Sequence, residues 1–291
     1  KPSFLERDDY IKSKFKIKGI ENIKFGLAKE LSKKISRRTN STKISDDPDL
    51  FIQANFKDES CVIRTKPVFV YGRYSKKIRK LSQKQELCNS CNGIGCHNCN
   101  FKGMEDVASI EGKISNLLLK KFNANQIKIN WIGGEDQSSL VLGNGRPFFA
   151  KILNPKKRNR ILRKFSDLGS VNLFELQKIH LQPKGSITFK SEVSVTIDTA
   201  KPISSSQLKK LKTLVNSEIE DISRDRKNFH KKIYKVGYKK LGQNSFILDL
   251  IVDGGLPIKS FIQNSDTVPN VSELLKNKCK CKKFDFKNII V

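Results

Sequence analysis

Hydrophobic and polar residues alternate with a period of two over several short stretches, and this period predicts β-strands. The stretches are residues 49–56, 61–64, 67–74, 139–142, 147–153, 186–198 and 246–252. Residues 106–122 carry apolar side chains at helical spacing, and residues 20–35 and 205–219 are also predicted to be helical. Strands outnumber helices and do not alternate with them regularly. The pattern therefore predicts an α+β chain with a mixed, mainly antiparallel sheet.

The same pattern divides the chain into three parts. Residues 1–85 are predicted to form a small α/β unit, residues 86–103 a cysteine-rich linker and residues 104–291 a larger, sheet-rich domain. A length of 291 residues is typical of about two domains. The chain begins with Lys1 rather than methionine, so we expect a truncated or processed form of a longer protein.

Charge narrows the class of partner. Lys and Arg number 57 against 29 Asp and Glu, which gives a formal net charge of +28. An excess of this size, spread along the chain, can neutralise many phosphates and favours a nucleic-acid partner. A membrane partner is not expected, because no apolar run approaches the roughly 18 residues of a spanning helix. The sequence contains no evident glycine-rich phosphate loop that could bind a nucleotide cofactor.

Four of the seven cysteines stand close together in the linker. Cys88, Cys91, Cys96 and Cys99 form two Cys-x-x-Cys pairs joined by a glycine-containing turn. Four thiolates at this spacing can bind one tetrahedral zinc ion, whose closed coordination sphere makes it structural. Two small disulfides or an iron–sulfur cluster are the alternatives. The remaining residues, Cys61, Cys279 and Cys281, are expected to be free thiols.

Two further features suggest chemistry on a polyanion. Glu135 and Asp136 are adjacent acids in a glycine-flanked turn before a predicted strand, where a carboxylate can be held for reaction or can simply cap the turn. Residues 151–164 contain seven basic residues and no acid. Residues 76–80 are mostly basic and come shortly after two tyrosines. Both runs suit an RNA backbone, although a solvated surface is the alternative for each.

Three blocks in this order resemble the THUMP-containing tRNA pseudouridine synthase family of archaea and eukaryotes. They are the run Pro67–Tyr74 with its basic extension, the Cys88–Cys99 knuckle, and Glu135-Asp136 followed by Leu142-Gly143-Asn144-Gly145-Arg146-Pro147-Phe148 and Asn154–Arg158. The resemblance covers nearly the whole chain. It implies a pseudouridine synthase-like catalytic domain in residues 104–291 and an incomplete THUMP-like domain in residues 1–85.

The resemblance also implies a reaction and its residues. The family isomerises uridines 54 and 55 in the TΨC arm of tRNA, which implies a cytoplasmic, monomeric, tRNA-binding enzyme with Asp136 as its catalytic nucleophile and no catalytic cofactor. Because the target base is stacked within an RNA arm, it must be flipped into a pocket. The residues implied to bind the RNA are Arg73, Tyr74, Arg146, Lys156, Lys157, Arg158 and Lys259.

The C-terminal part departs from the family pattern. Pro257 stands where the family has a tyrosine that packs against the target base, and residues 264–270 are shortened and lack an arginine. Lys259 is retained, and Tyr234 or Tyr238 could replace the missing aromatic ring. Two alternatives to the enzyme therefore stay open. One is a catalytically reduced relative that binds tRNA or acts as an RNA chaperone, and the other is a zinc-bearing structural protein of a ribonucleoprotein.

Overall fold

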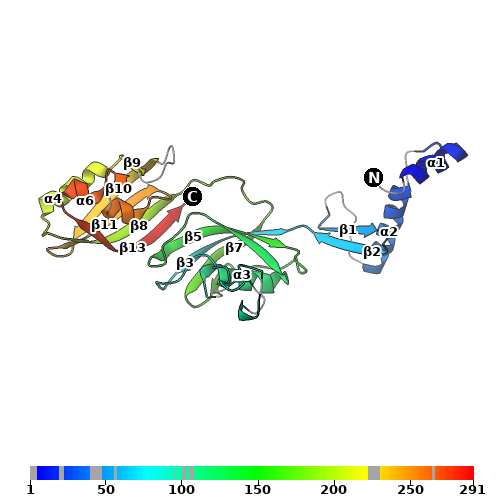
Figure 1. Cartoon of the computed structure of the whole chain (residues 1–291), viewed down its shortest axis with the longest axis horizontal. Coiled ribbons are helices and arrows are strands. Elements are labelled where there is room, and N and C mark those ends of the chain that lie inside the picture. The colour runs from blue at the N-terminus through cyan, green and yellow to red at the C-terminus, as the bar shows by residue number, and fades with distance from the viewer. Residues whose placement is uncertain are drawn as a thin grey trace. The chain divides into compact units, whose positions relative to one another are not determined.

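The structure is a computed structural model of the whole chain (Figure 1). It describes residues 5–19, 23–39, 48–55, 58–94, 96–99, 103–104, 108–221, 230–263 and 266–291. The chain divides into two compact units, residues 1–66 and residues 67–291. No helix in the described residues is long and apolar enough to cross a membrane.

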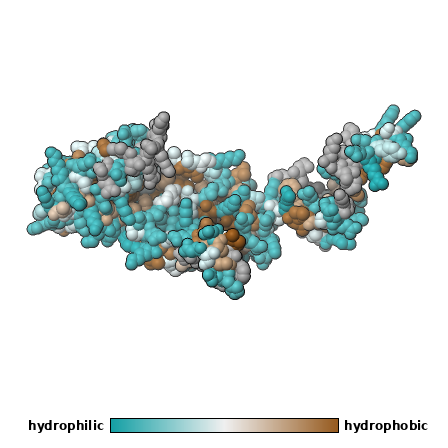
Figure 2. Space-filling model, in the orientation of Figure 1, coloured by the Kyte–Doolittle hydropathy of each residue, from teal (hydrophilic) through white to brown (hydrophobic). Residues whose placement is uncertain are grey.

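The described residues of the smaller unit form two helices and one hairpin. The helices are α1 (Leu5–Phe15) and α2 (Ile23–Thr39), and strands β1 (Leu50–Asn55) and β2 (Ser60–Thr65) pair antiparallel. The hairpin exposes its large apolar side chains, and α2 buries none of its residues. Figure 2 shows hydrophobic residues gathered at the hairpin. The expected helix and strand positions are confirmed here within a few residues. Residues 20–22 and 56 of these predicted elements lie outside the described part.

The boundary between the units lies earlier than the sequence suggested. Strand β3 (Val68–Lys76) belongs to the larger unit, where it pairs antiparallel with β5 (Leu140–Leu153) and β7 (Val171–Ile179). Its Val70 and Tyr74 side chains are fully buried in the core of that unit. The expected end of the first domain at residue 85 is therefore replaced by a division between residues 66 and 67. A strand's period shows that it has a buried face but not which sheet it joins.

The larger unit is built on an eleven-stranded sheet with the order β12-β9-β10-β11-β8-β13-β5-β3-β7-β6, in which β4 also pairs with β5 (Figure 1). Every pairing among the described strands is antiparallel except that of β13 with β5, which confirms the mixed, mainly antiparallel sheet. The remaining strands are β4 (Gln126–Trp131), β6 (Phe165–Asp167), β8 (Lys190–Thr199), β9 (Glu218–Asp221), β10 (His230–Lys240), β11 (Ser245–Asp253), β12 (Thr267–Val268) and β13 (Cys279–Ile290).

Strand β5 is longer than predicted. Two strands separated by a turn at Gly143–Gly145 were expected, but one strand of 14 residues runs through that segment. On one side β5 pairs with β13 before the glycines and with β4 after them. On its other side it pairs with β3 throughout, with a register shift between Tyr74 and Lys76. The glycines therefore mark a change of neighbouring strand rather than a chain reversal. This places the loop between β4 and β5, which contains Asp136, beside strands from both halves of the sheet.

Short helices cover the sheet. Helix α3 (Ile110–Phe122) is capped by the Ser109 hydroxyl, which accepts from the Gly112 N–H at 3.0 Å, and its apolar face is buried as predicted. Residues 106–107 of the predicted helix lie outside the described part. The predicted helix at 205–219 is shorter: α4 (Ser205–Lys209) continues into a 3-10 turn (Lys210–Leu214), and β9 follows. The other helices are η1 (His97–Cys99), α5 (Ile258–Gln263) and α6 (Val271–Leu275).

Candidate functional site

Asp136 lies in the turn between β4 and β5. One of its carboxylate oxygens, Oδ1, accepts hydrogen bonds from the Ser138 N–H at 2.8 Å and the Ser138 hydroxyl at 2.5 Å. The Ser139 N–H and hydroxyl donate to the Asp136 carbonyl at 3.0 and 2.8 Å. An aspartate that bonds the backbone two residues on forms an Asx-turn. The turn-capping geometry is thus present, and it leaves the second oxygen, Oδ2, for another partner.

That partner is Lys259, from the start of helix α5. Its ammonium nitrogen lies 2.7 Å from Asp136 Oδ2, and both side chains are partly exposed, 50% for Lys259 and 32% for Asp136. Partial burial raises the pKa of Asp136, but hydrogen bonds from Lys259 and Ser138 outweigh burial and lower this pKa to about 2. The Asp136 carboxylate is therefore ionised at neutral pH and carries its charge at a solvent-accessible place.

Glu135 has a different environment from its neighbour. Its side chain is fully buried, with Lys76 Nζ 3.2 Å from one oxygen and the Tyr74 hydroxyl donating to the other at 2.9 Å. Arg146 Nε lies 3.5 Å from the second oxygen. Burial lowers the pKa of Lys76 and raises that of Tyr74 well above its ordinary value. Glu135 is therefore the shared anion of a buried polar cluster formed with Lys76, Tyr74 and Arg146.

The buried polar cluster also holds the Asp136 turn in place. Lys76 Nζ donates to the backbone carbonyls of Asp136 at 3.1 Å and Gln137 at 3.3 Å. The Gln83 amide donates to the Tyr74 hydroxyl at 2.9 Å and to the Gly133 carbonyl at 3.3 Å. Hydrogen bonds from buried polar groups restrict the backbone that accepts them. The cluster thus fixes both ends of the turn from below while the Asp136 carboxylate faces outward.

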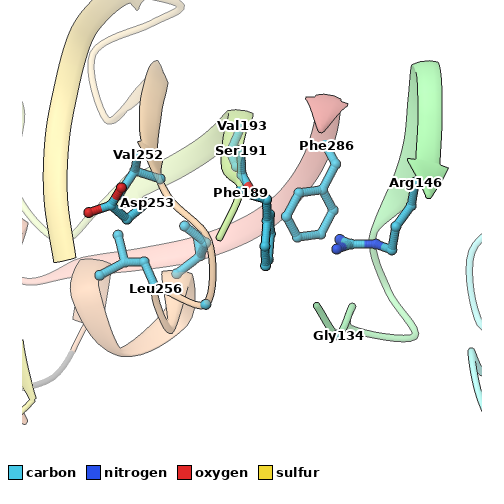
Figure 3. A pocket seen from close by; sticks show the side chains of 11 residues that line it. Gly134, Arg146, Phe189, Ser191, Val193, Val252, Asp253, Leu256 and Phe286 are labelled. Atoms are coloured by element: carbon cyan, nitrogen blue, oxygen red, sulfur yellow. The ribbon is translucent and has the colours of Figure 1, made fainter. Parts of the chain in front are cut away.

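A cavity of about 220 Å³ opens beside this turn. Gly134, two residues before Asp136, and Ile258, directly before Lys259, both line it. Figure 3 shows the rings of Phe189 and Phe286 near the centre, with Leu256 and Asp253 on one side and Arg146 on the other. The cavity is mainly apolar with a few polar groups, which is the usual character of a small-molecule or base pocket.

Phe189 occupies its place because two glycines make room for it. A Cβ atom added at Gly254 would lie 2.3 Å from the Phe189 ring, and one at Gly133 would lie 2.4 Å from it. Residues 186–189 of the predicted strand lie outside it in the structure, because β8 begins only at Lys190. Phe189 was not singled out from the sequence, where a single phenylalanine beside a strand carries no special signal.

Arg146 is fully buried yet incompletely paired. Its Nη1 donates to the Ile132 carbonyl at 2.9 Å, and its guanidinium carbon lies 4.5 Å from the centre of the Phe286 ring. Among the described residues, Nη2 has no hydrogen-bond partner. Figure 3 shows the guanidinium extending toward the rings that line the cavity. An unpaired buried N–H is unfavourable, so this group suits an acceptor on a bound molecule.

Two residues expected to contact RNA are structural. Arg73 donates through its guanidinium to the backbone carbonyls of Asn144, Gly145 and Ile289, at 2.6, 2.9 and 2.5 Å. Tyr74 is fully buried in the cluster with Glu135. Arg73 joins β3 to β5 and β13, and neither side chain is available to a polyanion. Burial of this kind depends on distant segments and has no local sequence pattern.

The basic residues Lys156, Lys157 and Arg158 are surface residues away from the cavity. Lys156 and Lys157 are exposed, and Arg158 is half-buried. They follow the end of β5, whereas Asp136 precedes its start, so a strand of 14 residues separates them. At about 3.3 Å per residue this amounts to roughly 40 Å. A ligand that contacts both regions must therefore be a macromolecule.

The four linker cysteines come together as predicted. Their sulfur atoms all lie within 4.8 Å of one another, with Cys88 to Cys96 at 3.8 Å and Cys91 to Cys99 at 3.7 Å. The Cys96 and Gly103 N–H groups donate to Cys99 Sγ at 3.1 and 3.2 Å, and these bonds lower the Cys99 pKa to about 6. The cluster could bind a metal ion. Gly95, in the expected turn, lies outside the described residues.

The other cysteines lie outside this cluster. Cys61 is exposed, and burial raises the pKa values of Cys279 and Cys281 to about 11. Both of these thiols are therefore protonated at neutral pH. In the part of the chain that the structure describes, the Cys88–Cys99 group is the only set of three or more potential ligands close enough to share an ion.

Comparison with known proteins gives consistent matches. The family described as "Pus10, C-terminal" matches residues 69–289. A protein of Nitrosopumilus maritimus named tRNA pseudouridine synthase Pus10 is 42% identical over the whole chain, which spans 76% of that relative. Proteins of the same name from Cenarchaeum symbiosum and Korarchaeum cryptofilum are 34% and 27% identical. They match 100% and 99% of this chain, over 72% and 82% of their own lengths.

Proposed function

Since this chain belongs to the Pus10 family, whose curated relatives are named tRNA pseudouridine synthases, we propose that it isomerises uridine to pseudouridine in tRNA. The observation that carries the proposal is the ionised Asp136 carboxylate, held by Lys259 at 2.7 Å beside a cavity lined by apolar rings. The position of the target, uridine 54, uridine 55 or both, is part of the proposal and rests on the resemblance alone.

In the proposed reaction Asp136 is the nucleophile. Its Oδ2, which pairs with Lys259 at 2.7 Å in this structure, attacks C1′ of the target ribose, and the N1–C1′ bond breaks with its electron pair left on the uracil. The uracil then turns within the cavity, C5 attacks C1′ and the carboxylate leaves. C5 loses its hydrogen as a proton, and N1 gains a proton, so the product is an isomer of the substrate. Neither an oxidant nor a reductant is needed.

The cavity beside Asp136 receives the flipped base in this proposal. A uracil has apolar faces and two carbonyl oxygens, so it suits a site between apolar rings with one free donor. Phe189 supplies a ring, and the unpaired Nη2 of Arg146 supplies the donor. Pro257, which replaces the family's tyrosine, does not line the cavity, whereas its neighbours Leu256 and Ile258 do. Phe189 thus provides an aromatic surface that position 257 does not.

Exposed basic residues guide the rest of the tRNA. Lys156, Lys157 and Arg158 are placed to contact phosphates roughly 40 Å of strand away from the reacting ribose. The Asp136 site and these residues together span a distance that suits a folded tRNA arm. A THUMP-like role for the N-terminal part of the chain stays a prediction.

Lys259→Met is expected to shift the acid limb of the kcat/KM profile to higher pH. In the wild type the pKa of Asp136 is about 2, so this group stays ionised at every pH above about 3. Without Lys259, partial burial is opposed by Ser138 alone and the pKa rises. The same ion pair stabilises the fold above about pH 4, and that contribution is lost as pH falls toward 2.

The matched control for this pH experiment is Lys282→Met. Lys282 makes a more exposed ion pair with Asp198, at 3.7 Å, away from the cavity. Its removal should leave the acid limb where the wild type has it. If the Lys259 variant and the wild type gave the same pH profile, Lys259 would not be what keeps Asp136 ionised.

The cysteine cluster is proposed to hold one structural zinc ion, because four thiolates match zinc's tetrahedral preference and leave no open position. Cys91→Ser should lower the zinc content from one ion per chain to well below one and make residues 88–99 sensitive to protease. Cys61→Ser removes an exposed thiol outside the cluster and should change neither property. Elemental analysis that found iron, or no metal, in the wild type would contradict the zinc assignment.

The proposed function is tested by incubating the purified chain with unmodified tRNA transcript and mapping pseudouridine at each position. Product at uridine 54, 55 or both is expected. Binding without product at any position would instead favour the catalytically reduced, tRNA-binding alternative. Absence of both binding and product would remove the proposal altogether.

A further inference from the structure

A second, larger cavity of about 700 Å³ lies next to the first. The two cavities share Gly134 and Phe189 as lining residues. The second cavity, called here the flanking groove, is bounded by residues 129–134 of β4 and the turn after it, and by residues 182–189 before β8. The ring of Phe189 thus borders two adjoining spaces, of which only one is used by the proposed reaction.

The walls of the flanking groove combine aromatic surface with free amides. Trp131 and Phe149 line it, as do the amide side chains of Asn130 and Gln182. Within the described residues these two amide side chains form no hydrogen bond. A nucleobase has a flat face that can stack on an aromatic ring and edges that accept and donate hydrogen bonds, so these side chains match a nucleobase.

The charges of the groove favour a polyanion. Lys84 lines it and Lys184 lies within the 182–189 segment, and both are exposed. The one acid among the lining residues is Glu111, whose Oε2 already accepts from the Gln85 N–H at 2.9 Å. An acidic protein segment would lack the stacking partners, and a membrane surface would not enter a groove of this shape. A strand of RNA satisfies both the charge and the aromatic walls.

We propose that the flanking groove binds the nucleotide next to the target uridine, unstacked from its neighbour, with Phe189 between the two bases. This inference rests on the proposed function, because it takes the first cavity as the site of the target base. The enzyme then recognises a dinucleotide step rather than a single flipped base. Asn130 and Gln182 read the edge of the second base, and Trp131 and Phe149 supply apolar contact.

The test pairs changes in the protein with changes in the RNA. The tRNA transcripts carry an abasic nucleotide at each position flanking uridines 54 and 55 in turn, and the protein variant is Asn130→Ala with Gln182→Ala. For wild type, one abasic position should weaken the Kd about tenfold, the usual order for one stacked base. The double variant should bind intact tRNA more weakly and show a smaller further loss at that position, because the rings of the groove still stack on the base while the amide contacts are gone.

Two matched measurements complete the test. Gln126→Ala with Gln177→Ala removes two exposed amides outside the groove and should respond to the abasic RNA as wild type does. A 4-thiouridine at the sensitive position should cross-link within residues 129–134 or 182–189. Equal losses for wild type and the Asn130/Gln182 variant at every abasic position, or cross-links only elsewhere, would overturn the groove assignment.

The Kd measurements need no turnover, which separates this inference from the proposed function. If the Asn130/Gln182 variant reduces the Kd loss at one abasic position but no pseudouridine forms, the groove assignment stands and the proposed enzymatic activity is refuted. If pseudouridine forms but the Kd losses from the abasic nucleotide and from the protein variant are strictly additive, the enzymatic activity stands and the groove assignment is refuted. If the chain failed to bind tRNA, both would be refuted.

Discussion

Asp136→Asn is expected to abolish pseudouridine formation, with a loss of roughly 10³-fold or more, while tRNA affinity changes little. The amide keeps the shape of the carboxylate and its bonds to Ser138, but it cannot form the ester-like bond to C1′. The affinity is expected to persist because the phosphate contacts are made by basic residues elsewhere. Mapping of pseudouridine and a filter-binding Kd on the same preparation measure both properties.

Ser138→Ala is the matched control for the Asp136 variant. It removes the hydroxyl donor to Asp136 Oδ1, at 2.5 Å, and leaves the backbone N–H at 2.8 Å. We expect a loss of less than about tenfold, since the carboxylate and Lys259 both remain. Full activity in Asp136→Asn would disprove the nucleophile, whatever the behaviour of Ser138→Ala.

Lys76→Ala is expected to lower the free energy of unfolding by about 3 kcal/mol. The substitution removes a fully buried ammonium 3.2 Å from Glu135 and three of its bonds to backbone carbonyls. Breaking one side of a buried pair leaves an uncompensated charge, which is typically unfavourable by about 3–5 kcal/mol. The lower end applies because Arg146 and Tyr74 still face Glu135. The melting temperature should fall by roughly 6 to 12 °C.

The neighbouring residue provides the control. Lys77 forms an exposed ion pair with Asp167 at 3.0 Å, and Lys77→Ala should leave the melting temperature nearly unchanged. Activity should fall in Lys76→Ala even below its melting temperature, because Lys76 holds the carbonyls of the Asp136 turn. Equal melting temperatures for the two alanine variants would contradict the description of the buried polar cluster.

Features that depend on local sequence were predictable. The spacing of Cys88, Cys91, Cys96 and Cys99 brings the sulfur atoms together because few residues separate them. The turn at Asp136 and the buried face of α3 follow likewise from nearby glycines and from helical spacing. In each case the interacting groups lie within about fifteen residues, where the backbone geometry leaves few arrangements.

Features that depend on distant segments were not predictable in detail. Lys259 meets Asp136 across 123 residues, and without the family resemblance nothing near Asp136 identifies it. Arg73 reaches the Ile289 carbonyl across 216 residues, and Phe189 fits between glycines from two other segments. Nothing in the sequence around these charged and aromatic residues indicates which distant segments they contact. Only the pairing order of the sheet decides whether they are buried.

Pro257 lies beside the cavity but does not line it. Its ring precedes helix α5, where a missing N–H is tolerated, and its carbonyl accepts from the Phe261 N–H at 2.9 Å. Tyr234, suggested as a replacement for the missing tyrosine, donates its hydroxyl to Asp253 at 3.0 Å and does not line the cavity. The departure at Pro257 therefore removes an aromatic residue from a position beside the cavity while Phe189 remains within it.

In the proposed reaction the chain forms a new bond at C5 of a tRNA uridine, with Asp136 as the nucleophile. Formation of a C5–C1′ bond expels the hydrogen of C5, so tRNA labelled with tritium at uridine C5 reports each turnover directly. Wild-type protein in catalytic amount is predicted to release one tritium per modified uridine, and Asp136→Asn none. No release by the wild type, or equal release by the two proteins, would contradict the account.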